Sequence, residues 1–209
     1  MSNGDEVVAE FDGDLTIIRF NRPASRNSLS GATLTALDSL FSTATARAGI
    51  NSVIFTGSGD VFASGADIRE LAQLNTVTAR FFSERGQTLF QRIASARQLT
   101  IAAINGYCMG GALDLALACD VRVASKSAIF AHPGSRLGII TGWGGTQRLP
   151  RLIGRARTAE LFFTGRRFDA EEALQFGLVS RIDDPVLDRA IQLARNTRKE
   201  VADFSATSD

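Results

Sequence analysis

Residues 105–114 read Asn-Gly-Tyr-Cys-Met-Gly-Gly-Ala-Leu-Asp, and this stretch decides the fold class. Apolar residues of a short strand lead into it, small residues carry the chain through a turn, and an apolar helical segment follows. Residues 62–70, Phe-Ala-Ser-Gly-Ala-Asp-Ile-Arg-Glu, repeat the same design. Two such turns from strand to helix indicate an α/β protein.

Each of these turns places a helix N-terminus beside small residues. The first backbone N–H groups of a helix have no partner within the helix, and the helix dipole adds partial positive charge there. Because glycine and alanine leave space, a ligand oxygen can approach these groups. Two such amides that converge on one point would form an oxyanion hole. From the residues alone, two tight structural turns remain the alternative.

Strands and helices alternate along the rest of the chain. Residues 7–11 and 15–20 predict a hairpin around Asp12-Gly13-Asp14. In a predicted helix over 77–97, the expected core contacts are Phe81, Phe82, Leu89 and Ile93. Further strands are predicted at 52–56, 100–104, 121–124, 128–131 and 179–182, and further helices at 31–47, 110–119, 145–153, 157–163, 170–176 and 186–199. Strands often come in pairs before a helix, so a spiral of ββα units fits better than a doubly wound sheet.

Composition excludes several classes of protein. The chain has 209 residues, 44% hydrophobic and 22% charged, with a net charge of +1, so it shows no basic footprint for nucleic acid. No apolar run approaches the ~20 residues of a membrane span, and no signal segment is visible at the start. Cys108 and Cys119 lack the spacing of a zinc or disulfide site, so we expect no metal, reduced thiols and a cytoplasmic location.

Two enzyme classes lack their motifs. A serine hydrolase of the G-x-S-x-G type is not indicated, because no serine lies in that pattern. A dinucleotide-binding G-x-G-x-x-G is also missing, since Gly57 and Gly59 are followed by Phe62. The chain has a single histidine, His132, which excludes any mechanism that needs two.

Four segments, taken in order, resemble the crotonase, or enoyl-CoA hydratase/isomerase, superfamily. They are residues 20–29, 64–70, 105–120 and 130–154, and the likeness runs from about residue 6 to residue 182. The resemblance implies a crotonase (ClpP-like) spiral, acyl-CoA thioesters as ligands, and a homotrimer or a hexamer built as a dimer of trimers. It implies no cofactor, because coenzyme A is part of the substrate. It divides the chain into a spiral core, residues 1–185, and a short, apparently truncated helical segment, residues 186–209.

The same resemblance assigns roles to residues of the site. The oxyanion amides would be those of Ala66 and Gly111. The coenzyme A arm would run along Ser64, Ala66, Asp67, Ile68 and Arg69, with Arg69 near a phosphate. Arg26 is a second candidate for that phosphate, or else a solvated loop arginine. Gly110, Gly134 and Trp143 complete the expected substrate contacts, and Trp143 either walls the acyl pocket or packs in the core.

The catalytic carboxylates depart from the family pattern. Hydratases of this family use two glutamates, and the corresponding positions here are Asp114 and Gly134. Asp114 is the expected acid or base, although an acidic residue in the first turn of a helix also complements the helix dipole. Gly134 cannot transfer a proton. His132, two residues before Gly134, is either a substitute acid or base or a packed structural histidine.

The sequence therefore predicts an acyl-CoA-binding enzyme that hydrates or isomerises an enoyl-CoA in fatty-acid or related metabolism. Two alternatives stay open. One is a CoA-thioester-binding homologue with little or no catalysis. The other is a decarboxylase or thioesterase that uses the same enolate-stabilising amides.

Overall fold

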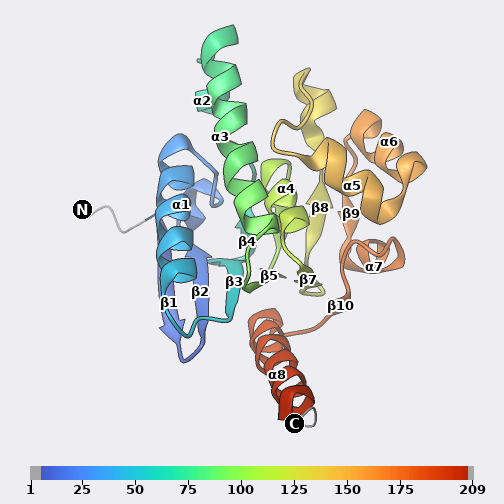
Figure 1. Ribbon diagram of the computed structural model, residues 1–209. Helices are drawn as coiled ribbons and strands as arrows, with labels where there is room; N and C mark the ends of the chain where they lie inside the picture. Colours follow the sequence, from blue (N-terminus) through green and yellow to red (C-terminus); the bar gives the residue numbers. More distant parts are fainter. Residues whose placement is uncertain (1–5, 207–209) are drawn as a thin grey trace.

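A computed structural model of the chain describes residues 6–206, and side chains through residue 197. Two sheets form its centre (Figure 1). The larger sheet has the strand order β1-β2-β3-β5-β7-β10 and the smaller has the order β4-β6-β8-β9. The strands are β1 (Val7–Asp12), β2 (Leu15–Phe20), β3 (Ser52–Gly57), β4 (Val61–Ala63), β5 (Leu99–Ile104), β6 (Tyr107–Met109), β7 (Val121–Ala124), β8 (Ile129–Ala131), β9 (Phe168–Asp169) and β10 (Arg181–Ile182). The α-helices are α1 (Gly31–Ala46), α2 (Ile68–Leu71), α3 (Thr76–Ala94), α4 (Gly111–Ala118), α5 (Gly145–Ile153), α6 (Arg155–Thr164), α7 (Ala170–Gln175) and α8 (Val186–Ala206), and the short 3₁₀ segments are η1 (Pro23–Ser25) and η2 (Pro133–Leu137).

The ββα spiral is confirmed, and the strand order shows how each unit is divided between the two sheets. In the pairs β3/β4, β5/β6 and β7/β8, the first strand joins the larger sheet and the second joins the smaller one. A helical segment follows each pair before the chain returns for the next. The strands β2, β3, β5 and β7 run parallel, as do β4, β6 and β8. Because the carboxyl ends of β4, β6 and β8 lie at one edge, the segments that follow them meet there.

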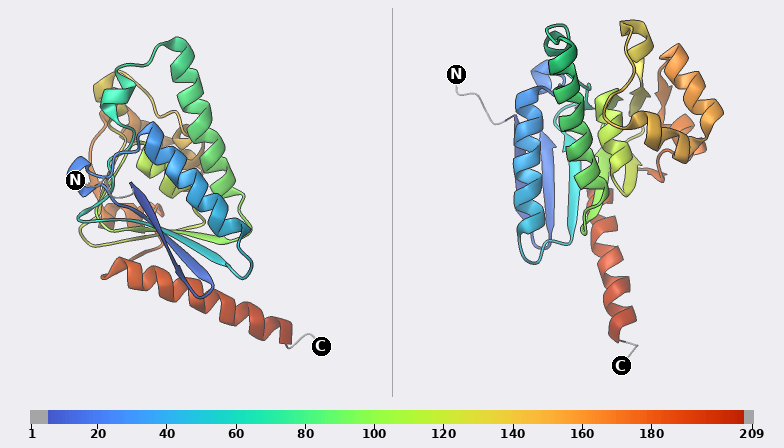
Figure 2. Two further views of the ribbon diagram at one scale, coloured as in Figure 1. Left: turned by 90° about the vertical axis from the view of Figure 1, so that its left-hand side faces the viewer. Right: turned by 45° about the horizontal axis from the view of Figure 1, so that its top comes forward.

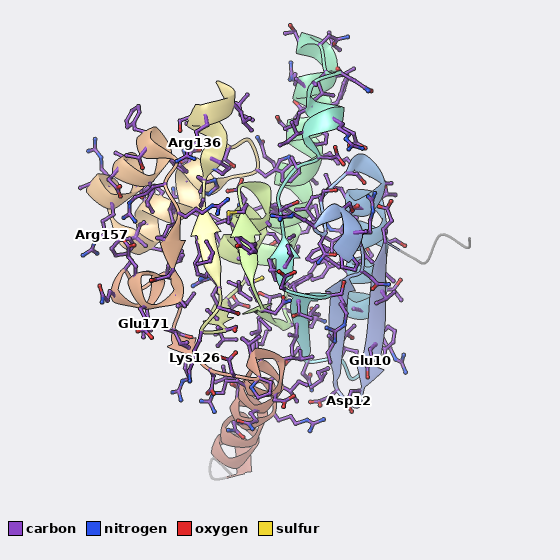
Figure 3. All side chains as sticks on the ribbon, turned by 180° about the vertical axis from the view of Figure 1, so that it is seen from behind. Glu10, Asp12, Lys126, Arg136, Arg157 and Glu171 are labelled. Carbon is purple, nitrogen blue, oxygen red and sulfur yellow. The ribbon has the colours of Figure 1, made fainter. Side chains whose placement is uncertain are left out.

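Helices cover both faces of the larger sheet (Figure 2). On one face, α1 buries Leu34, Leu37 and Phe41 at the expected helical spacing. On the other face, α8 buries Val186, Ala190 and Ala194 against Ile17, Ile54 and Ile101 of the strands. Arg195 of α8 also pairs with Asp12 at the β1–β2 turn, at 2.7 Å; Asp12 is labelled in Figure 3. Helix α8 therefore covers one face of the larger sheet and lies far from α2 and α3 (Figure 1).

The elements differ from the predictions in a few places. Helix α3 ends at Ala94 instead of 97, and α8 continues to Ala206 instead of 199. The assignment of Phe81 to the core is wrong, because its side chain is 65% exposed. The first turns of α3 extend beyond the sheets (Figure 1), so no layer covers that side chain. Phe82 is half-buried, and Leu89 and Ile93 are buried as predicted.

The predicted boundary of the C-terminal segment falls at the start of α8. Helix α8 begins at Val186, where the sequence analysis divides the chain, and residues 207–209 of the expected C-terminal segment lie outside the described residues. That division stays a prediction.

No helix in the described part of the chain is long and apolar enough to cross a membrane. Cys108 and Cys119 are buried free thiols, and burial raises the pKa of both.

Candidate active site

The segments after β4, β6 and β8 open onto one cavity of about 770 Å³. Its walls come from α2 and α3 on one side and from η2, α5 and α6 on the other (Figure 1). Apolar side chains such as Leu71, Phe82, Ile140 and Phe162 dominate these walls. A mostly apolar cavity with a few polar groups is the usual form of a small-molecule site. The cavity lies at the opposite end of the molecule from α8.

The two glycine-rich turns meet at the inner wall of this cavity. Gly65 has φ +90°, and a Cβ atom there would lie 2.6 Å from the Met109 carbonyl oxygen and 3.2 Å from the Gly111 amide nitrogen. Only a glycine permits both this conformation and this approach. The turn is held from the other side, because Leu29 N–H donates to the Gly65 carbonyl oxygen at 2.8 Å. The structure thus brings together the segments that the sequence analysis paired.

The amides of Ala66 and Gly111 have the properties expected of oxyanion donors. Both residues line the cavity, and Gly111 is the first residue of α4. Among the described residues, neither N–H group has an acceptor, whereas the neighbouring Gly110 N–H donates to the Ala131 carbonyl oxygen at 2.8 Å. Two free donors side by side at a cavity wall can hold a carbonyl oxygen.

The acidic residues beside Ala66 have structural roles. Asp67 caps α2 by accepting from Arg69 N–H at 2.9 Å, and Ser28 Oγ donates to its second oxygen at 3.2 Å. Glu70 accepts from Gly31 N–H at 2.7 Å at the start of α1. These bonds fix the turn that carries Ala66. Asp67 is therefore placed as a support of the cavity wall.

The remaining candidates for the coenzyme A arm lie around the cavity. Ser64 and Ile68 line it, and Ile68 is 60% exposed at its mouth. Arg69 is exposed on α2 and is not among the described lining residues. Arg26 is exposed in the loop after β2; its carbonyl oxygen accepts from Ser64 N–H at 3.0 Å, and its guanidinium lies 5.8 Å from the Tyr107 ring centroid. Both arginines are free to meet an anionic group outside the cavity.

Asp114 lies in the first turn of α4 and is fully buried. The Thr141 hydroxyl donates to its Oδ2. Its Oδ1 faces Gly145, where any Cβ atom would collide with it at 2.1 Å. Desolvation raises the pKa of Asp114 to about 6, against the lowering effects of Thr141, of the Trp143 and Gly145 amides and of Arg148. Asp114 is not among the described residues that line the cavity.

His132 lines the cavity and contacts Asp114. Its side chain is 4% exposed, it lines the cavity, and its Nε2 is 3.3 Å from Asp114 Oδ1. The Phe162 ring packs edge-on against the imidazole with the centroids 4.9 Å apart. Burial lowers the pKa of His132 to about 4. The histidine thus reaches the cavity that Asp114 does not.

Gly134 also lines the cavity, in the tight η2 turn. Ile139 N–H donates to the Gly134 carbonyl oxygen at 3.0 Å, and a Cβ atom at Gly134 would lie 2.5 Å from the Ile139 carbonyl oxygen. The turn therefore occupies the space that a side chain at this position would need.

Trp143 combines the two roles that the sequence left open. It is 3% exposed and packs against Phe82 and Phe90, and its Nε1 donates to the Phe82 carbonyl oxygen at 3.3 Å. It also lines the cavity, and a Cβ atom at Gly111 would lie 2.3 Å from its ring. It is both a core residue and part of the cavity wall beside Gly111.

Sequence reasoning missed two residues of the site. Thr141 has a signal, because it immediately precedes the glycine-rich turn of Gly142, Gly144 and Gly145. Phe162 has none, since its place beside His132 depends on how α6 packs over η2. No group of three or more histidine, cysteine or carboxylate side chains that could hold a metal ion occurs among the described residues.

Comparisons with known proteins converge on one family. The family described as enoyl-CoA hydratase/isomerase matches residues 10–207. The short-chain-enoyl-CoA hydratase of Clostridium acetobutylicum is 37% identical over 199 residues, which are 95% of this chain and 74% of the relative. The crotonyl-CoA hydratase of Syntrophomonas wolfei is 37% identical over 182 residues, which are 87% and 70% of the two chains.

Solved structures show the same likeness. The enoyl-CoA hydratase of Bacillus anthracis superposes with a TM-score of 0.87 at 38% identity, covering 91% of this chain and 76% of the other. That of Thermoplasma volcanium gives a TM-score of 0.90 at 34% identity, covering 94% and 78%. Sequence and fold therefore agree over most of the chain.

Proposed function

This chain belongs to the enoyl-CoA hydratase/isomerase family, and within that family we propose that it adds water to the double bond of an enoyl-CoA thioester. Relatives over most of its length are named enoyl-CoA hydratases. The observation that carries the proposal is the pair of unpartnered amides, Ala66 and Gly111, at the wall of an apolar cavity.

These amides provide the electrostatic part of the reaction. The thioester carbonyl oxygen accepts hydrogen bonds from Ala66 N–H and Gly111 N–H. As water adds to the β-carbon, negative charge moves onto that oxygen and an enolate forms. Fixed donors stabilise this charge more strongly than the neutral carbonyl, and removal of one such donor typically lowers kcat by about 10²–10³-fold.

The rest of the substrate follows the cavity. The coenzyme A arm leaves along Ser64 and Ile68, with Arg69 and Arg26 available to its phosphates. The acyl chain lies between Gly134 and Trp143. Hydration needs only water as the second reactant, so no cofactor is required beyond the coenzyme A of the substrate.

The test is product identification from a panel of acyl-CoA thioesters by mass spectrometry. We expect a product heavier by the mass of one water molecule from a short 2-enoyl-CoA. A product of unchanged mass with a shifted double bond, loss of carbon dioxide, or release of free coenzyme A would replace hydration by isomerase, decarboxylase or thioesterase chemistry. Binding without any product would favour a non-catalytic homologue.

We further propose a homotrimer or hexamer in the cytoplasm. Leu137, Ile139, Ile140 and Phe163 are 47–84% exposed around the mouth of the cavity. Exposed apolar groups gathered in one place are typical of association surfaces. Sedimentation at micromolar concentration tests the assembly, and a species of single-chain mass would contradict it.

A further inference from the structure

We propose that His132 is the group that exchanges the proton with the substrate, and that Asp114 is the positioning residue that orients and stabilises its imidazole. This inference rests on the proposed hydration. It assigns the proton transfer to a pair that stands in place of the two glutamates of the family pattern. Three independent observations support it.

The first observation is the chemistry of the cavity wall. Among the described residues that line the cavity, the side chains able to carry a proton are those of His132, Arg155 and several serines and threonines. No carboxylate, lysine, cysteine or tyrosine is among them. Arginine stays protonated and hydroxyl groups are poor bases at neutral pH, so only the imidazole both reaches the cavity and can take and return a proton there.

The second observation is the polar atoms of the pair. His132 Nε2 and Asp114 Oδ1 are both fully buried, and in the described structure neither makes a hydrogen bond of ordinary geometry. The Trp143 and Gly145 amides lie close to the carboxylate and lower the pKa of Asp114, but neither aligns with Oδ1. They lie 3.3 Å apart, within ion-pair distance but without the alignment of a hydrogen bond. Buried polar atoms without partners are rare, because desolvation destabilises them. Two of them side by side at a cavity indicate a pair that tightens when substrate is bound.

The third observation is how neighbouring groups position the pair. Asp114 is fixed by α4 and by the Thr141 hydroxyl. The imidazole packs edge-on against the Phe162 ring, and the backbone of His132 is the N-cap of η2. The closed turn at Gly134 leaves no room for the second carboxylate of the family pattern. A buried carboxylate that holds an imidazole in one orientation is a general way to prepare a histidine for proton transfer.

The step balances with water as the only added reactant. His132 takes a proton from water as the water oxygen bonds to the β-carbon, and the electron pair of the double bond moves through the α-carbon onto the thioester oxygen. The Asp114 carboxylate stabilises the imidazolium that forms. The enolate then collapses, the α-carbon takes the proton from the imidazolium, and the neutral ring is restored.

The charges around His132 and Asp114 are consistent with these proton-transfer steps. At neutral pH, Asp114 is ionised and the His132 ring is neutral, because their pKa values are about 6 and about 4. The other titratable or charged groups that act on Asp114 are Arg148 of α5 and the Cys108 thiol of β6, and Arg155 of α6 lines the same cavity as His132. The proton of the neutral ring is expected on Nε2, beside the carboxylate, which leaves the lone pair on Nδ1 as the base.

The kinetic test compares variants of the full chain without an affinity tag. We expect His132→Ala to lower kcat by about 10²–10⁴-fold, to bind butyryl-CoA within a few-fold of the wild type, and to recover activity with added imidazole. Asp114→Asn should lower kcat and displace the acid limb of the pH profile from near pH 6, and Asp114→Glu should recover part of the loss. Thr16→Val is the matched control, since Thr16 is a buried residue of β2 with an unpartnered hydroxyl far from the cavity.

Wild-type kcat in His132→Ala would overturn the proposal. So would a loss of activity in Asp114→Asn alone, because Asp114 itself would then be the acid and base. If His132→Ala does not fold, His132→Gln and His132→Asn give the same comparison, with thermal unfolding as the check on folding.

A second measurement separates this proposal from the proposed hydration. His132 is the single histidine of the chain, so ¹⁵N NMR of the imidazole reports on it without overlap. We expect the Nε2–H tautomer, a pKa that falls further in Asp114→Asn, and a signal that shifts when butyryl-CoA binds. Wild-type protein that hydrates no enoyl-CoA would overturn the hydration. An imidazole signal indifferent to Asp114→Asn would overturn the pair even if hydration occurs.

Discussion

Asp114 and His132 have pKa shifts of opposite direction, and the stability of the protein depends on both. The pKa of Asp114 rises from 3.8 to about 6 on folding, so the folded state binds the proton more tightly and loses stability as pH rises through this range. The pKa of His132 falls from 6.5 to about 4, so the folded state gains stability as pH rises through that range. In the wild type, the two effects largely cancel.

Single variants should reveal each effect. Relative to the wild type, Asp114→Asn is expected to gain about 3 kcal/mol of unfolding free energy between pH 4 and pH 6, because only the destabilising carboxylate is removed. His132→Gln should lose a similar amount between pH 4 and pH 6.5. Denaturant unfolding at several pH values measures both slopes. Parallel curves for the two variants would contradict the assigned environments.

Gly134 offers a second prediction at this scale. Gly134→Ala should cost about 1–3 kcal/mol and lower activity, because the Ile139 carbonyl must move and His132 is the N-cap of the same η2 turn. Gly138→Ala is the control in the same turn: it has φ +68° and open space around it, so it should cost about 1 kcal/mol and keep activity. For the same reason, Gly134→Glu should not restore a working carboxylate. Full activity in Gly134→Ala would show that the turn is adaptable.

The sequence could identify most of the candidate site residues, but not which of their side chains contact one another. Spacing placed Asp114 in the first turn of a helix beside Gly111, as found. It could not show that the hydroxyl of Thr141, 27 residues later, donates a hydrogen bond to this carboxylate, or that His132 Nε2 lies 3.3 Å from it. These contacts depend on how separate turns of the spiral pack together, and no local pattern records that.

At the scale of elements, periodicity predicted the strands of the larger sheet, the β1–β2 hairpin and nearly all helices, but not the short strands β6 and β9 of the smaller sheet. The exceptions have physical reasons. Phe81 shares the apolar pattern of α3 but is 65% exposed, and the first turns of that helix extend beyond the sheets (Figure 1). Helix α8 continues past its predicted end at 199 to Ala206, although its last buried residue among the described side chains is Ala194. Propensity sets the extent of a helix only weakly once one face is packed.

The packing of α8 can be tested directly. Ala190 is fully buried between α8 and the larger sheet. Ala190→Arg places an unpaired charge in that apolar layer and should lower the free energy of unfolding by several kcal/mol. Gln192 is exposed on the same helix, and Gln192→Arg should change stability by less than about 0.5 kcal/mol. Thermal unfolding compares the two. Equal melting temperatures would mean that α8 does not rest on the sheet.

At the scale of the whole molecule, α8 and the cavity lie at opposite ends. Destabilisation at Ala190 and inactivation at His132 should therefore be separable, since sites far apart without shared partners usually act additively. The two effects are separable because each ββα unit contributes one strand to the larger sheet, on which α8 packs, and one strand to the smaller sheet, which ends at the cavity.

In the proposed complex, the thioester carbonyl oxygen lies between the amides of Ala66 and Gly111. The most direct test compares two ligands, butyryl-CoA and the thioether S-butyl-CoA, which lacks only the carbonyl oxygen. Calorimetry on the wild type should give a Kd about 10–100-fold weaker for the thioether, since two hydrogen bonds of about 1 kcal/mol each are lost. Equal affinities for the two ligands would show that these amides hold no carbonyl oxygen.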